Sequence, residues 1–190
     1  MNVLNNKNCL ITGATGGLGQ EIAKTLIQNN CNLFLTAQNK KRLQQLKDDL
    51  DCINVNKSRI NYCEGDITKQ NQIKKIITKV RRDFHHIDIL INCAGIFHSK
   101  PISQSTIEDF DKIFGVNIRA PFLFCKEFSK DMIQKKWGSY VNNKHLERLE
   151  YNEGLSLKLP DLTTMLTIYN VLIPNGMTKP RRLNIIERSL

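Results

Sequence analysis

The chain has 190 residues, a length that fits one domain followed by a tail. Its hydrophobic fraction of 41% allows a buried core, no apolar run is long enough to predict a membrane span, and the first residues lack a signal-peptide pattern. The net charge of +10 makes a nucleic-acid binder one hypothesis, but few aromatic residues accompany the basic ones, so we interpret the charge as a solvated surface.

The six cysteines are scattered and form no CxxC pair. This usage predicts reduced thiols in a cytoplasmic protein, and it disfavours the alternative of a disulfide-bonded secreted domain. No group of residues has the spacing of metal ligands, so we expect no metal site. The positions are 9, 31, 52, 63, 93 and 125.

Strands and helices alternate through the first 142 residues, with short links between them. This order predicts an α/β fold, a Rossmann-type doubly wound parallel sheet with right-handed crossovers. We assign residues 1–142 to this domain. The predicted strands cover 8–12, 31–37, 59–65, 87–92 and 138–142.

Apolar residues recur at helical spacing between these strands. The first two stripes are Leu18, Ile22, Ala23, Leu26 and Ile27, then Leu43, Leu46 and Leu50; the third is Ile73, Ile76, Ile77, Val80 and Phe84. Another helix is predicted near 105–114. A longer one starts near Asn117, tolerates Pro121 in its first turn, and buries Phe122, Cys125, Phe128, Met132 and Ile133.

The alternation ends after Asn143, and residues 143–190 form a divergent tail of uncertain structure. Three prolines interrupt it, and no supersecondary pattern is evident. We therefore expect the sheet to be incomplete at its C-terminal side. A frameshift, a splicing variant or a split gene would each explain such a tail.

A glycine-rich turn follows the first strand and opens the first helix. The first glycine permits a sharp exit from the strand, the second lets a pyrophosphate approach the backbone, and the third lets the helix pack closely. The helix N-terminus favours phosphate charge. This context predicts dinucleotide binding, with the cofactor-binding candidates Thr12, Gly13, Thr15, Gly16, Gly17, Leu18 and Gly19.

The G-x3-G-x-G spacing after a threonine resembles the short-chain dehydrogenase/reductase family, and three further motifs extend the resemblance over residues 7–142. "GDIT" (65–68) implies that Asp66 binds the adenine amino group near the Ile67 backbone. "NCAG" (92–95) implies that Asn92, Ala94 and Gly95 lie under the adenine ribose. "VNIRAPF" (116–122) makes Asn117 the counterpart of the catalytic asparagine, which anchors a water in the proton relay. Within this family, the sequence most resembles the branch that contains 3-oxoacyl-carrier-protein reductases.

The end of the second predicted strand bears on the choice of cofactor. An NAD enzyme usually places a carboxylate there, whereas this chain has Ala37 and Gln38 followed by basic residues 40–42. Gln38 can donate a hydrogen bond but carries no charge, where NADP-using members of the family tend to have an arginine. We expect NADP, with NAD as the alternative.

The resemblance also implies a serine just after the fifth strand and a Tyr-x-x-x-Lys pair on a helix, which acts as acid and base. Residues 143–145 contain no serine, and the pair occurs only as Tyr140 and Lys144. That match begins inside a predicted strand, where four residues span about 13 Å, too far for hydrogen bonding. We interpret it as coincidence. We interpret the other reactive residues as surface positions: His98, Tyr151, Ser156 and Lys158.

These observations predict an NAD(P)-dependent oxidoreductase by resemblance, with a small carbonyl or alcohol substrate and impaired or absent turnover. The alternatives are a non-catalytic dinucleotide-binding protein and the nonfunctional product of a damaged gene. The family often pairs through the long helix after Asn117, so a homo-oligomer is possible by resemblance. We expect neither nucleic acid nor a membrane as a partner.

Overall fold

The computed structural model describes residues 4–97 and 101–142. The regular elements of this part alternate as the sequence predicts, and strand ends differ from the expected ones by one or two residues. They are β1 (Asn8–Thr12), α1 (Gly17–Gln28), β2 (Asn32–Ala37), α2 (Lys40–Ile53), β3 (Ile60–Glu64), α3 (Gln70–Phe84), β4 (Ile89–Asn92), α4 (Ile107–Phe114), α5 (Ala120–Gln134) and β5 (Ser139–Asn142).

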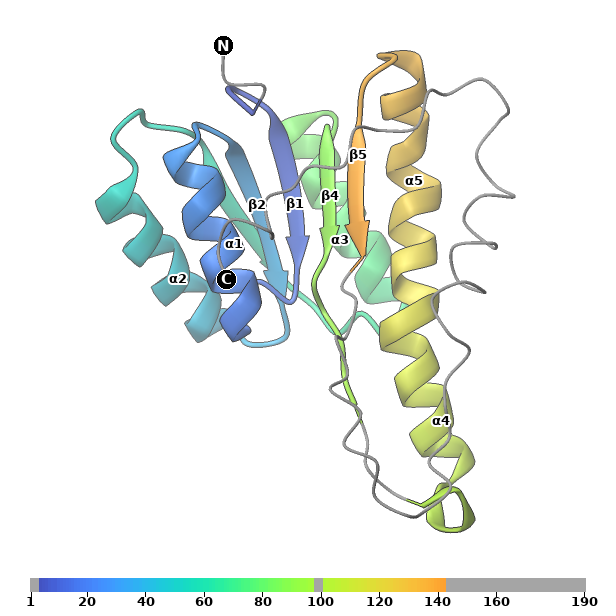
Figure 1. Ribbon diagram of the computed structural model, residues 1–190. Helices are drawn as coiled ribbons and strands as arrows, with labels where there is room; N and C mark the ends of the chain where they lie inside the picture. Colours follow the sequence, from blue (N-terminus) through green and yellow to red (C-terminus); the bar gives the residue numbers. More distant parts are fainter. Residues whose placement is uncertain (1–3, 98–100, 143–190) are drawn as a thin grey trace.

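The strands form one sheet in the order β3-β2-β1-β4-β5, and each neighbouring pair is parallel. This arrangement confirms the predicted Rossmann-type sheet (Figure 1). Because all strands run the same way, their carboxyl ends meet at one edge, which lies at the bottom in Figure 1. We call it the carboxyl edge. From β1 the chain adds β2 and β3 on one side, and it then returns to the other side of β1 to add β4 and β5. Ligands of such sheets bind where the strand order reverses, which is between β1 and β4 in this sheet.

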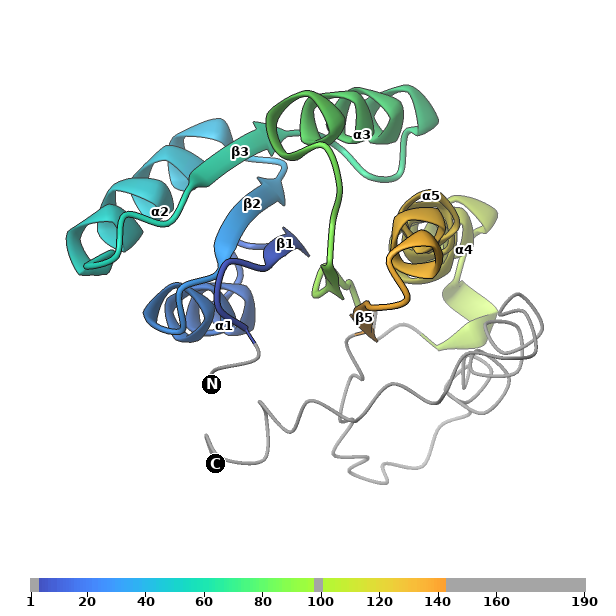
Figure 2. The same cartoon turned by 90° about the horizontal axis from the view of Figure 1, so that it is seen from above.

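Helices cover both faces of the sheet. One face carries α1 and α2, and the other carries α3 and α5 (Figure 2). Successive β1 residues therefore enter different cores: Cys9 and Ile11 pack with the first pair of helices, and Leu10 packs with the second. The near-continuous apolar sequence of the inner strands reflects this burial on both sides.

An arginine links the two helices of the second face. Arg81 of α3 lies 3.1 Å from the Glu127 carboxylate and also pairs with Asp131, both on α5. Its guanidinium lies over the Phe128 ring at 5.0 Å. These contacts hold α3 and α5 side by side over the sheet.

Three predicted core positions are wrong. Leu18 is 47% exposed, because it lies in the first turn of α1, at the open carboxyl edge. The inner face of α5 is also shifted: Phe124 is fully buried, whereas Phe122 is only half-buried and Ile133 is 42% exposed. Every residue from 121 to 125 is apolar, so the pattern alone could not select the buried side.

The remaining expectations about the described residues concern thiols and membranes. None of the six cysteines, all of which lie in the described ranges, forms a disulfide. Across residues 4–97 and 101–142, no helix has the length and hydrophobicity that crossing a bilayer requires.

Candidate functional site

The turn between β1 and α1 depends on two glycines. Gly13 has φ of +65°, and a Cβ there would lie 2.6 Å from the Ala94 Cα atom. Gly19 packs against the same turn, since its Cβ would lie 2.5 Å from the Gly13 carbonyl oxygen. Both positions therefore exclude any larger residue. This confirms the conformational roles predicted for the first and third glycines of the motif.

The start of α1, in contrast, is open. A Cβ at Gly17 would meet no atom within 4 Å, and Gly16 and Gly17 are both exposed. Gly16 is the N-cap, and no side chain caps this end of the helix. The first backbone N–H groups of a helix have no intrahelical partner, so this end presents donors and a partial positive charge to an anion.

A second loop, after β4, lies against this turn. The Ala94 N–H donates to the Thr12 hydroxyl at 3.2 Å, which ties the end of β4 to the end of β1. The strands themselves are paired up to Thr12 and Asn92. Thr12, Gly13, Asn92 and Ala94, all predicted site residues, are thus brought together at the carboxyl edge.

The ends of β2 and β3 carry the next two predicted residues. The Gln38 amide donates to the Asp66 carboxylate at 3.4 Å. The Thr68 amide and hydroxyl donate to the same oxygen at 3.0 and 2.7 Å. Burial would raise the pKa of the Asp66 carboxyl, but the hydrogen bonds from Thr68 and the nearby Lys69 charge hold this pKa below its usual range. Asp66 is therefore a fixed anion at neutral pH.

The Ile67 side chain is not part of the exposed edge. It is 7% exposed and belongs to the core beneath α3 and α5. Only its backbone could face a ligand, as the resemblance implies.

Asn117 lies in a π-helical segment, Gly115–Arg119, that joins α4 to α5. Its side-chain amide donates to the Ile96 carbonyl at 2.8 Å and accepts from the Ile96 N–H at 2.9 Å. The side chain therefore fixes the loop after β4 to the helix. Single π turns inside α-helices frequently mark functional sites. The sequence pattern did not reveal this turn.

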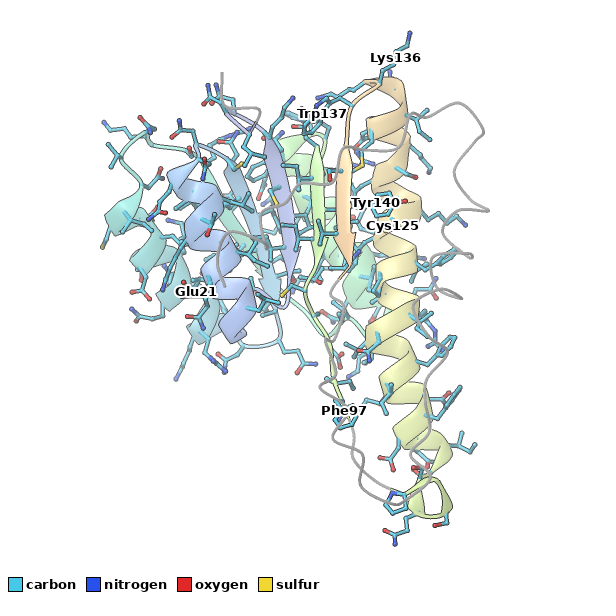
Figure 3. All side chains as sticks on the ribbon, viewed as in Figure 1. Glu21, Phe97, Cys125, Lys136, Trp137 and Tyr140 are labelled. Carbon is cyan, nitrogen blue, oxygen red and sulfur yellow. The ribbon has the colours of Figure 1, made fainter. Side chains whose placement is uncertain are left out.

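Tyr140 lies in β5, paired with Leu90 of β4, as expected for a strand residue. Burial raises the pKa of its phenol, and the nearby Cys125 adds to this shift. Figure 3 shows the labelled Tyr140 and Cys125 side chains between β5 and α5. A phenol with a raised pKa in a core is poorly suited to proton transfer at neutral pH.

Several other candidates lie outside the described residues: Lys144, Tyr151, Ser156, Lys158 and His98. Among the residues that the structure does describe, no group of three or more His, Cys, Asp or Glu side chains could hold a metal ion.

Sequence reasoning missed one contact of the turn. The Arg42 guanidinium, from the first turn of α2, donates to the Thr15 carbonyl at 3.1 Å. The same carbonyl accepts from the Gln20 side chain at 2.9 Å. Asn39 caps α2 and accepts from the Arg42 N–H at 3.0 Å, which fixes the helix start that carries Arg42. No sequence signal indicated that this helix start lies beside the turn.

Comparisons with known proteins agree with this geometry. The family model described as short chain dehydrogenase matches residues 7–144. A 3-oxoacyl-[acyl-carrier-protein] reductase of Rickettsia typhi is 30% identical over 148 residues, which cover 78% of this chain and 57% of the relative. An uncharacterized oxidoreductase of Staphylococcus haemolyticus is 27% identical over 170 residues, which cover 90% of this chain and 71% of the relative.

Solved structures give the same result. A metagenomic short-chain oxidoreductase in complex with NADP is 25% identical with a TM-score of 0.68, over 73% of this chain and 62% of that one. A short-chain dehydrogenase from Sphingobium yanoikuyae in complex with NADPH is 27% identical with a TM-score of 0.66, over 72% and 52% of the two chains. The matched region thus spans between half and two thirds of these structures.

Proposed function

Since this chain belongs to the short-chain dehydrogenase/reductase family, we propose that it binds NADP(H) at the carboxyl edge and does not turn over by the family's serine–tyrosine–lysine route. The observation that carries the proposal is the turn at Gly13–Gly19. Its close contacts with Ala94 shape the turn, and its open helix start offers N–H donors.

The described residues fit a dinucleotide. The backbone of residues 13–19 would hold the pyrophosphate at the start of α1. Asp66 offers a fixed carboxylate for the adenine amino group, and the loop at Asn92–Gly95 would lie under the adenine ribose. When bound, the nicotinamide cofactor supplies the hydride that reduces a carbonyl or accepts one from an alcohol.

The lack of turnover rests on the residues that would move the proton. In the sequence up to Leu190, the only lysine four residues after a tyrosine is Lys144, after Tyr140. Tyr140 is a strand residue with a raised pKa. The side-chain amide of Asn117 is hydrogen-bonded to the backbone N–H and C=O of Ile96. We infer that Asn117 positions the loop after β4, and that no acid–base pair completes the relay.

The Gly17→Asp variant tests the binding site. Aspartate fits there without a clash and suits a helix start, so the fold should be kept or slightly stabilised. Its carboxylate would repel the pyrophosphate. We expect NADPH fluorescence to change with the wild type and to stay unchanged with the variant, while the wild type consumes no NADPH in the presence of small ketones and aldehydes.

The matched control is Gln28→Asp, at the exposed far end of the same helix, which should bind like the wild type. Equal binding by Gly17→Asp and the wild type would place the cofactor elsewhere. NADPH consumption with a carbonyl substrate would contradict the proposed lack of turnover, and its persistence in an Asn117→Ala variant would show a route independent of the family's relay.

A further inference from the structure

The peptide group between Thr15 and Gly16 is held at both of its polar atoms. The Gly16 N–H donates to the Gly13 carbonyl at 3.0 Å, inside the turn. The Thr15 carbonyl accepts from the Gln20 side chain at 2.9 Å and from the Arg42 guanidinium at 3.1 Å. A carbonyl oxygen has two lone pairs, so these two donors satisfy it fully. The peptide group is therefore fixed in one orientation in the free protein.

This peptide group stands directly before the open end of α1. Gly16 is the N-cap and Gly17 the first helical residue, and both are exposed. Glycine tolerates more backbone conformations than any other residue, so these positions do not restrain the peptide group. Without donors on its oxygen, the peptide group would be free to rotate. The negative carbonyl end would then at times face an anion at the helix start, and the Gly16 N–H would lose its acceptor.

Gln20 supplies its donor from within α1 itself. Its own N–H donates to the Gly16 carbonyl at 2.9 Å, so the helix fixes the residue, and its side chain is half-buried. The side-chain amide reaches back past the helix start to the Thr15 carbonyl. This amide is neutral, so it adds no charge that would attract a phosphate. Its effect on an anion is therefore confined to the orientation of the peptide group.

We propose that Gln20 is a positioning residue for the pyrophosphate of the cofactor. It keeps the negative end of the Thr15 peptide group turned toward side chains of α1 and α2, so that a diphosphate meets the N–H groups of the helix start. The inference rests on the proposed function, because Gln20 acts on the same turn. The pyrophosphate is common to NADPH and NADH, so Gln20 supports the binding of both alike.

The test compares the NADPH and NADH affinities of the wild type and Gln20→Met by fluorescence titration. Methionine keeps the length of the side chain and a high helix propensity but has no donor. We expect both dissociation constants to rise about three- to tenfold, the range that corresponds to the loss of one hydrogen bond. Gln28→Met makes the same change at the exposed last residue of α1 and should bind both cofactors like the wild type.

Amide hydrogen exchange in the free protein, measured by NMR, separates positioning from support of the helix. Gln20→Met should speed the exchange of the Gly16 amide, because this N–H bonds the Gly13 carbonyl only while the peptide group keeps its orientation. The amide of Ala23, buried within α1, should exchange at the wild-type rate. Faster exchange of both amides would mean that Gln20 only stabilises the helix, and would overturn the inference.

Unchanged affinities for both cofactors in Gln20→Met would overturn the inference as well. A loss confined to NADPH would do the same, since both cofactors carry the pyrophosphate. In these cases the wild type still binds its cofactor, and the proposed function stands. If the wild type bound neither cofactor, the proposed function itself would fail, so the two failures are distinguishable.

Discussion

The carboxylate of Asp66 shows how a single residue at the edge is tuned by its neighbours. Its side chain is 31% exposed, and one oxygen accepts both the amide and the hydroxyl of Thr68. These bonds favour the ionised form, so the pKa of Asp66 is lower in the folded protein than in the unfolded chain. The stabilisation that this provides is present above the unfolded-state pKa and is lost as pH falls through the folded-state pKa.

We therefore predict that Asp66→Asn lowers the free energy of unfolding at neutral pH, and that the difference from the wild type shrinks as the medium becomes acidic. The neutral amide cannot gain from ionisation. Urea unfolding measured at a series of acidic to neutral pH values would show this. Asp111→Asn, exposed on α4, is the control for replacing a surface carboxylate by an amide and should change the free energy of unfolding little. A deficit of constant size for Asp66→Asn at every pH would refute the assignment.

At this scale the sequence predicts backbone requirements better than side-chain contacts. Gly13 and Gly19 were identified from spacing alone, because few residue types tolerate a positive φ or such close backbone contact. The hydrogen bond from Arg42 to Thr15 could not be predicted. It joins residues 27 positions apart and depends on how α2 lies against the turn.

Among the elements, the continuous helix formed by α4, the π segment and α5 positions one loop of the site, the loop after β4. Figure 1 shows it running beyond the carboxyl edge, with the π segment inside it. Asn117 lies in this segment and bonds the backbone of Ile96 in both directions. The π segment thus sets the position of the loop that follows β4.

We predict that Asn117→Ala reduces the free energy of unfolding by about 1–3 kcal/mol, because it leaves the N–H and C=O of a half-buried Ile96 without these partners. Chemical denaturation measures the loss, and the Ile96 amide should exchange its hydrogen faster than in the wild type. Gln134→Ala, exposed near the end of α5, should change neither. If Asn117→Ala were as stable and as protected at Ile96 as the wild type, the positioning role would be wrong.

Element types were predictable because strand and helix periodicities differ clearly in β1 to β4 and in α1 to α3. Ile73, Ile76, Val80 and Phe84 are all buried on α3, as their spacing predicts. The register of α5 was not predictable, because its first residues are apolar on all sides. Nor was the π segment, which no periodicity distinguishes from ordinary helix.

For the whole molecule, the parallel sheet explains why residues far apart in the chain share one site. Thr12, Gln38, Asp66 and Asn92 end or follow four different strands, and parallel pairing places all of them at the carboxyl edge. The alternation of elements predicted this arrangement. The structure does not describe residues 143–190, so the predicted divergence of the tail stays a prediction.

Amide hydrogen exchange with and without saturating NADPH tests the binding claim most directly. We predict that NADPH slows the exchange of amides in residues 13–19 and 92–95, while the last turn of α5, at the opposite end of the sheet, exchanges at the same rate. Unchanged exchange in both loops at saturating NADPH would contradict the account.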